Sequence, residues 1–422
     1  PVKQGPSNTS QREVLKMPDH PTRPEILLLD GNFYIDRPLH HYAWMRANAP
    51  LYYDEVGDIW GVTLHEDIMT VSKSPETFCS GKSSRPEPGI LIPSMINMDD
   101  PNHKRRRNLV NSGFTPRRLE DSRSKIRRIT NRLIDAVCER GECEFVRDIA
   151  APLPLIMIGD MLGMPEEDFE TLLRWSEDML ASTSATASPE LKERAQQAGI
   201  EYATYALAAI ATRREQPRDD LLSILVHAEI DGHSLDEEAL IHESLLILVG
   251  GDETTRHVIT EGTLALMENP AERQKLIDDP ARIPTAVEEL LRWVSPIKNM
   301  NRTATRDTEL RGQRVREGDR LLLLYPSGNR DERVYESPDI LDVTRSPNPH
   351  VAFGGYGTHH CLGASLARLE LQIMFEELTR RLPDLELATD GALPQRASNF
   401  ITGIEAMPVR FTPSKPLTDA TP

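Results

Sequence analysis

A glycine-rich loop that ends in a cysteine is the segment of this sequence best suited to chemistry. Residues 353–363 read FGGYGTHHCLG, and an amphipathic helix is expected from Cys361 to about Leu382. Glycines let a backbone approach a flat ligand closely. A thiolate at a helix N-terminus is stabilised by the helix dipole and by free amide groups. The pattern therefore predicts a metal-ligating thiolate at Cys361 beside a flat ligand.

Two other interpretations of this loop stay open on the residues alone. His359, His360 and Cys361 could form a zinc site, although adjacent positions rarely give the spread of a tetrahedral site. A buried cysteine beside a turn needs no ligand at all. The remaining cysteines are interpreted in that way: Cys79, Cys138 and Cys143.

A second segment places an acid and an alcohol side by side in the middle of a long helix. Ser234 and Glu237 form a capping-box pattern, and the helix that they open is expected to end before Pro270, a length of roughly 50 Å. Its centre reads GGDETT, in which two glycines weaken the helix. Either this is a tolerated kink with a solvated face, or a small ligand lies there and Glu253 and Thr254 move protons to it.

A third segment, EELLR at 288–292, carries opposite charges on one helix face. Glu289 and Arg292 are three residues apart in a helix bounded by Pro284 and Pro296, so they can pair. Exposed pairs of this kind are common and stabilise by less than ~1 kcal/mol. Taken by itself, the pair favours a purely structural role.

These segments lie in a chain whose pattern is mostly helical, with short strands toward both ends. From about residue 100 to 290, apolar residues recur at three- and four-residue spacing, and no linker divides the chain. Other expected elements are a helix at His41–Ala49, strands at Leu51–Leu64 and Leu321–Tyr325, and strands at Leu385–Phe411 that turn at Thr402-Gly403. The sequence predicts a mainly α chain with small β-sheets (α+β). One large domain is expected over residues 25–414, between flexible arms at 1–24 and 415–422.

The composition excludes several classes of protein. The 422 residues include 49 lysines and arginines against 66 aspartates and glutamates, a formal net charge of −17, which argues against a general binder of nucleic acid or anionic membranes. With 39% hydrophobic and 27% charged residues, the chain can bury a sizeable core. It has no run of about 18 apolar residues, no secretory signal pattern and too few cysteines for a disulfide framework. We expect a cytoplasmic monomer with no membrane span.

In order and spacing, the three segments resemble those of a cytochrome P450, and the resemblance extends over nearly the whole chain after residue 25. It implies the P450 fold, with haem b between the long central helix and the cysteine loop, Cys361 as the axial iron ligand, and Glu289–Arg292 as a structural ion pair. The resemblance also implies roles for other residues: His103, Arg107, Arg302 and His359 at the haem propionates, Phe353 and Gly363 in the haem-ligand loop, and Glu253 and Thr254 in proton delivery to dioxygen.

The activity implied by the resemblance is that of a monooxygenase, which inserts one atom of O2 into an unactivated C–H bond. Electrons are expected from NAD(P)H through an external ferredoxin and ferredoxin reductase, because 422 residues leave no room for a fused reductase domain. A basic cluster suits the docking of an acidic ferredoxin. Its residues are Lys104, Arg105, Arg106, Arg117 and Arg118.

The expected substrate pocket is apolar, which fits a lipid-like ligand. Its expected walls are Ile90–Met95, Val249, Ile297–Met300, Phe400 and Ile401. Stretches such as INMDDPNHKRRRNLVNSGFT and SNFITGIEAMPVRFTPS resemble actinobacterial steroid side-chain hydroxylases. This resemblance implies oxidation of the terminal methyl group of cholesterol or cholest-4-en-3-one to the alcohol and then the acid.

The sequence departs from the common family pattern at the cysteine loop. The loop has one residue more between Phe353 and Cys361 than the commonest spacing, and His360 stands in place of a more usual aromatic residue. Three alternatives to a steroid hydroxylase are open: a terpenoid or methyl-branched fatty acid hydroxylase of the same fold, a thiolate-haem isomerase, dehydratase or peroxygenase without O2 activation, and a lipid carrier without metal. The acid–alcohol pair argues against the second, because those reactions need no proton relay to dioxygen.

Overall fold

The computed structural model of the chain describes residues 20–35, 37–86, 93–182, 187–230 and 232–417. The helices are α1 (Leu39–Asn48), α2 (His65–Lys73), α3 (Asn102–Asn111), α4 (Pro116–Asp135), α5 (Pro152–Met161), α6 (Phe169–Ala181), α7 (Pro189–Glu215), α8 (Leu221–Val226), α9 (Glu237–Glu268), α10 (Pro270–Asp278), α11 (Ile283–Val294), α12 (Tyr325–Gly328) and α13 (Ala364–Arg381). The strands are β1 (Leu51–Asp54), β2 (Ile59–Val62), β3 (Phe78–Cys79), β4 (Glu142–Glu144), β5 (Glu229–Ile230), β6 (His233–Ser234), β7 (Asn299–Ala304), β8 (Thr308–Leu310), β9 (Gln313–Val315), β10 (Arg320–Leu324), β11 (Glu386–Leu387) and β12 (Pro408–Arg410).

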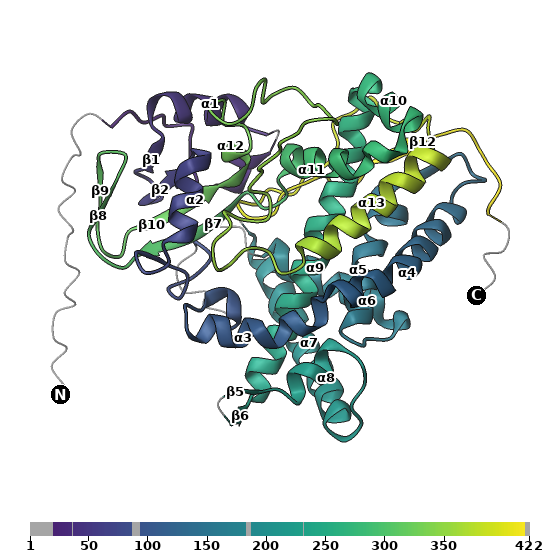
Figure 1. Ribbon diagram of the computed structural model, residues 1–422, viewed down its shortest axis with the longest axis horizontal. Coiled ribbons are helices and arrows are strands. Elements are labelled where there is room, and N and C mark those ends of the chain that lie inside the picture. The colour runs from purple at the N-terminus through teal and green to yellow at the C-terminus, as the bar shows by residue number, and fades with distance from the viewer. Residues whose placement is uncertain (1–19, 36, 87–92, 183–186, 231, 418–422) are drawn as a thin grey trace.

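A five-stranded sheet in the order β1-β2-β10-β7-β3 forms one side of the molecule, and most of the helices form the other (Figure 1). Strand β10 pairs in parallel with β2 and antiparallel with β7. Its four leucines, 321–324, are fully buried and contribute alternately to two hydrophobic clusters on the two faces of the sheet. A strand covered on both faces has an unbroken apolar run, which is why Leu321–Tyr325 was predictable as a buried strand.

Helix α9 runs through the middle of the helical half, where it contacts α5, α7, α11 and α13 (Figure 1). It begins two residues later than predicted, because Asp236 rather than Ser234 caps it. The Asp236 side chain accepts a hydrogen bond from the backbone N–H of Ala239 at 2.8 Å, whereas Ser234 belongs to β6. The helix has 32 residues, and the two glycines of GGDETT do not interrupt it.

The predicted turn at Thr402-Gly403 is wrong. The chain instead reverses between Gln395 and Ile404, which form an isolated antiparallel bridge. Gly403 has a different purpose, since a Cβ atom there would lie 2.2 Å from Nδ1 of His257. The glycine therefore allows the C-terminal segment to approach α9 closely.

The packed chain extends past both predicted domain boundaries. His20 accepts a hydrogen bond from the backbone N–H of Tyr53 in β1 at 2.9 Å. At the other end, the backbone N–H of Leu417 donates to Asp135 in α4 at 3.0 Å. Residues 1–19 and 418–422 of the two predicted arms lie outside the described residues.

The Glu289–Arg292 pair is fully buried rather than exposed. Arg292 donates to both carboxylate oxygens of Glu289, at 2.7 and 2.8 Å. It also donates to the carbonyl oxygens of Asn329 and Pro338, and Glu289 accepts from the backbone N–H of Asp342 at 3.0 Å. The pair therefore fastens α11 to the long loop that follows α12 and leads to the cysteine loop.

Replacing Arg292 with methionine is expected to lower the free energy of unfolding by roughly 3 kcal/mol, because it removes the fully buried partner of the Glu289 carboxylate and leaves only Arg345 to pair with it. The control is Arg282→Met, which breaks a half-exposed pair with Asp279 of the same spacing. The control should lose at most about 1 kcal/mol. Urea unfolding followed by circular dichroism measures both variants, and equal losses would contradict the role assigned to Arg292.

Candidate active site

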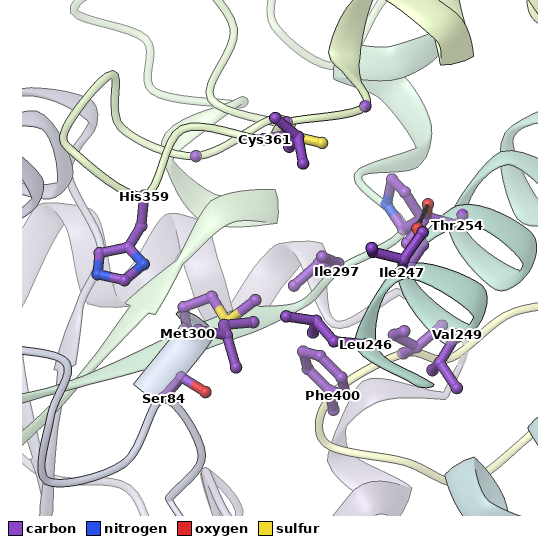
Figure 2. A pocket seen from close by; sticks show the side chains of 18 of the residues that line it. Ser84, Leu246, Ile247, Val249, Thr254, Ile297, Met300, His359, Cys361 and Phe400 are labelled. Carbon is purple, nitrogen blue, oxygen red and sulfur yellow. Dashed lines mark hydrogen bonds between the residues drawn. The ribbon is translucent and has the colours of Figure 1, made fainter. Parts of the chain in front are cut away.

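A cavity of about 690 Å³ lies between α9 and the cysteine loop. Its size is that of a small-molecule site, and its wall is mostly apolar. Figure 2 shows His359 and Cys361 on one side of it, Thr254 and Val249 of α9 on another, and Phe400 across the cavity from Cys361. Segments that are far apart in the sequence thus meet at one site.

Cys361 lies at the cavity wall immediately before α13. Its backbone N–H donates to the carbonyl of Phe353 at 2.9 Å, which closes the loop. Burial raises the pKa of the Cys361 thiol, while the backbone N–H groups of Gly363 and Ala364 and the charge of Arg107 lower it. Among the chain's four cysteines, Cys361 is the exposed one, and its exposed surface faces the cavity.

The glycines of the cysteine loop have two different purposes. Gly355 and Gly357 pack against Ser72 of α2, where a Cβ atom would lie 2.3 Å from its hydroxyl oxygen and 1.8 Å from its carbonyl oxygen, respectively. Gly363 lines the cavity, and a Cβ atom there would meet nothing within 4 Å. The open space beside Gly363 fits a flat ligand, as the sequence predicted for the loop as a whole.

Helix α9 leaves space on the opposite side of the cavity. A Cβ atom at Gly250 would meet nothing within 4 Å, whereas one at Gly251 would lie 2.6 Å from Ile158 of α5. One glycine thus widens the cavity, and the other lets α5 approach. The Thr254 hydroxyl, also on the cavity wall, donates to the Gly250 carbonyl at 3.3 Å.

Glu253 is fully buried behind Thr254 and is not among the residues that line the cavity. Burial alone would raise its pKa, but the charges of Arg256 and Arg396 hold the pKa of Glu253 well below its ordinary value. Arg256 donates to Glu253 at 2.9 Å and to Glu177 of α6 at 2.8 Å. The Glu177 side chain is 42% exposed. A series of ion-paired side chains, Glu253, Arg256 and Glu177, therefore connects this turn of α9 with the molecular surface.

Two buried carboxyl groups near the cavity were not singled out from the sequence. Burial and the charge of Glu253 raise the pKa of Asp252 well above its ordinary value. Glu370 of α13 lines the cavity, and burial and the charge of Asp252 raise the pKa of Glu370 to about 8. The sequence signal for Asp252 was its place within GGDETT, and that for Glu370 was its place in the helix that follows Cys361.

Four predicted cofactor-binding side chains come together at the cavity: His103, Arg107, Arg302 and His359. The rings of His103 and His359 stack with centroids 3.9 Å apart. Arg302 is 7% exposed, and burial lowers its pKa. Among the described residues, neither arginine has an ion-pair partner.

This charge distribution is a test of whether haem fits. Buried cations are normally paired, and the guanidinium groups of Arg107 and Arg302 face the cavity with only carbonyl oxygens as partners: Arg107 donates to His360 and Arg302 to Asn301. The two carboxylates of a haem would supply the missing anions. The thiol, the open space beside Gly363 and these two cations together fit the cofactor.

Part of the predicted substrate wall lines the cavity: Ser94, Met95, Val249, Ile297, Met300, Phe400 and Ile401. Pro93, Lys298 and Asn299, which the predicted ranges also included, are not among the lining residues. Ile297 and Ile401 form an isolated β-bridge, and the guanidinium of Arg85 lies 3.6 Å from the centre of the Phe400 ring. Residues 90–92 of the predicted wall lie outside the described residues.

The predicted basic docking cluster is not uniform. Lys104 and Arg117 are exposed, but Arg106 turns inward and donates to the fully buried Glu243 of α9 at 3.0 Å. Glu243 also accepts from the backbone N–H of Met95 at 2.8 Å, and burial raises its pKa to about 7. Arg106 therefore secures a cavity wall and is not part of a free basic surface.

The zinc interpretation of the cysteine loop has no support in the geometry. Within the described ranges, His, Cys, Asp and Glu side chains form no group of three that could hold a metal ion. The Nε2 atom of His359 instead lies 3.0 Å from the carbonyl oxygen of Met98. Nor does the described part of the chain contain a helix with the length and apolar character to cross a bilayer.

Comparison with known proteins shows the class of protein. The family described as Cytochrome P450 matches residues 283–389. The steroid C26-monooxygenase of Mycobacterium tuberculosis is 48% identical over 396 residues, which are 93% of this chain and 99% of that protein. The chain therefore belongs to the cytochrome P450 family and is a P450 monooxygenase.

Other relatives agree on the fold and differ in their named substrates. The methyl-branched lipid omega-hydroxylase of Mycobacterium bovis is 37% identical over 88% of this chain and 90% of that protein. The solved structure of Mycobacterium marinum cytochrome P450 CYP268A2 in complex with pseudoionone superposes with a TM-score of 0.86 at 33% identity, over 94% of this chain and 100% of that one. The predicted fold, mainly α with small β-sheets, is confirmed.

Proposed function

We propose that this monooxygenase hydroxylates the terminal methyl group of a sterol side chain, that of cholesterol or cholest-4-en-3-one, and oxidises the alcohol further to the acid. The observation that carries the proposal is the cavity, whose apolar wall follows α9 from His242 past Thr254 to Val258, with Cys361 on the facing side. An elongated apolar substrate can lie along this wall with one end at the reacting centre. The 48% identity to a protein named steroid C26-monooxygenase supports the same substrate class.

Haem b is the cofactor of the proposal. When bound, a thiolate-ligated haem cleaves dioxygen and supplies the oxygen atom that is inserted. Cys361 would hold the iron, and Phe353 and Gly363 would border the ring. The haem propionates would be held by four side chains that can donate hydrogen bonds to carboxylates: His103, Arg107, Arg302 and His359.

Each hydroxylation consumes O2, two electrons and two protons and releases one water. Thr254 presents its hydroxyl at the cavity wall, and we assign it the delivery of protons into the cavity. Glu253 lies one residue away and is connected through Arg256 to the partly exposed Glu177. Because a guanidinium stays protonated, Arg256 holds the two carboxylates in place, and Glu177 and Glu253 are the groups that can take up protons from solvent and release them without opening the apolar wall to water.

A methyl-branched lipid is the second candidate substrate, because a relative 37% identical to this chain is named for that activity. It would be oxidised at the same kind of chain-end carbon. The isomerase, dehydratase and peroxygenase alternatives are not favoured, since these relatives are named as a monooxygenase and a hydroxylase.

Electrons are proposed to come from NAD(P)H through a ferredoxin reductase and a ferredoxin in the cytoplasm. Arg107 of α3 donates to the carbonyl of His360, so α3 borders the cysteine loop. Lys104 and Arg117, which are near Arg107 in the sequence, are both exposed. Neither has an ion-pair partner among the described residues. This exposed charge suits an acidic ferredoxin.

The variant Thr254→Ala is expected to consume NADH but to form roughly tenfold less sterol alcohol and acid per NADH, because proton delivery is lost. The control is Thr260→Ala, a buried threonine of the same helix whose hydroxyl donates to the backbone carbonyl oxygen of Arg256 at 2.9 Å. Product analysis by mass spectrometry, with NADH consumption, measures the ratio. A normal ratio in Thr254→Ala would contradict the assigned role.

Exchanging Lys104 and Arg117 for glutamate is expected to slow reduction by ferredoxin about tenfold at low ionic strength, with sterol affinity unchanged. Stopped-flow absorption measures the rate. The pair Arg314→Glu and Arg410→Glu makes the same charge change at exposed sites elsewhere. Equal rates in the two double variants would show that α3 does not guide docking.

A further inference from the structure

Helix α9 continues along the cavity well beyond Thr254. His242, Leu246 and Val249 all line the cavity, and their spacing places them on one helix face. His242 precedes Thr254 by 12 residues, which corresponds to about 18 Å along the helix axis. Four fused rings with an extended eight-carbon side chain have a length of this order. His242 thus lies about one sterol length from the proposed reacting centre.

His242 is a polar residue that the protein itself does not use. It is partly buried, and its Nδ1 atom is buried without a hydrogen-bond partner among the described residues. By contrast, His103 and His359, which line other sides of the cavity, lie 3.3 Å and 3.0 Å from protein oxygens. The imidazole lines the cavity and makes no hydrogen bond with the described residues, so a ligand that pairs with either ring nitrogen gains a hydrogen bond that the free protein lacks.

The position of His242 is fixed by its neighbour. Glu243 is fully buried and accepts hydrogen bonds from the backbone N–H of Met95 at 2.8 Å and from Arg106 at 3.0 Å. These bonds join this turn of α9 to α3 and to the segment that carries Met95, which also lines the cavity. The imidazole is therefore held at a defined place in the wall.

We propose that His242 hydrogen-bonds the oxygen atom at C3 of the sterol and so determines which end of the substrate points toward Cys361. The inference rests on the proposed function, since it assumes a sterol. Cholest-4-en-3-one has one oxygen, at the opposite end from the methyl group that is oxidised. An imidazole N–H donates to that ketone, and the distance along α9 then places the side-chain end at Thr254.

The test compares two ligands that differ only at C3: cholest-4-en-3-one and cholest-4-ene. Their dissociation constants are measured from the spin-state change of the haem-loaded oxidised protein. The native protein should bind the ketone about tenfold more tightly, the effect of one hydrogen bond. His242→Phe, which keeps a ring but no donor, should weaken ketone binding to the level of the hydrocarbon. His242→Gln, which keeps a donor, should restore part of the preference.

The control is Val249→Ala on the same helix face, which should weaken binding of both sterols by the same factor. A ketone preference that persists in His242→Phe, or an equal loss for both ligands, would overturn the role of His242 while leaving the proposed function intact. Native protein that binds neither sterol would overturn the proposed function itself. The two failures are therefore distinguishable.

Discussion

The buried ion pair between Glu289 and Arg292 is the interaction on which the rest of the site depends. Two charges without solvent exposure are stable only when their remaining hydrogen-bonding groups are satisfied. Here the additional partners belong to the loop that follows α12: backbone groups such as the carbonyl of Asn329 and the N–H of Asp342, and the Arg345 side chain. Because that loop leads into the cysteine loop, the pair fixes where Cys361 lies relative to the helical core.

Helix α9 meets the cysteine loop from the other side and separates two environments. Its cavity side is apolar and is widened at Gly250, where no side chain fills the space. Behind it, Glu253 is held by Arg256 and Arg396 in a buried charged cluster. The same turn therefore offers a dry surface to a substrate and a charged connection to solvent, which is what oxidation of an unactivated carbon with protons from water requires.

Sequence reasoning succeeded where chemistry demands particular residue types at fixed spacing. The cysteine loop, the centre of α9 and the EELLR segment were recognisable for that reason, and the leucines of β10 revealed a buried strand. It failed where tertiary contacts decide. A run of three arginines does not reveal that Arg106 turns inward to Glu243. Ser234 and Asp236 are equally good capping residues by type, and only the pairing of Ser234 in β6 excludes it as the cap. His242 could not be singled out because helical spacing does not show which face borders a cavity.

The central claim is that Cys361 supplies a thiolate to haem in this cavity. The most direct measurement is the absorption spectrum of the reduced protein under carbon monoxide, for the native chain, for Cys361→Ser and for the control Cys79→Ser. The account predicts the strongly red-shifted Soret band of a thiolate-ligated haem in the native protein and in Cys79→Ser, and its loss in Cys361→Ser. The same band in Cys361→Ser, or no such band in the native protein, would contradict it.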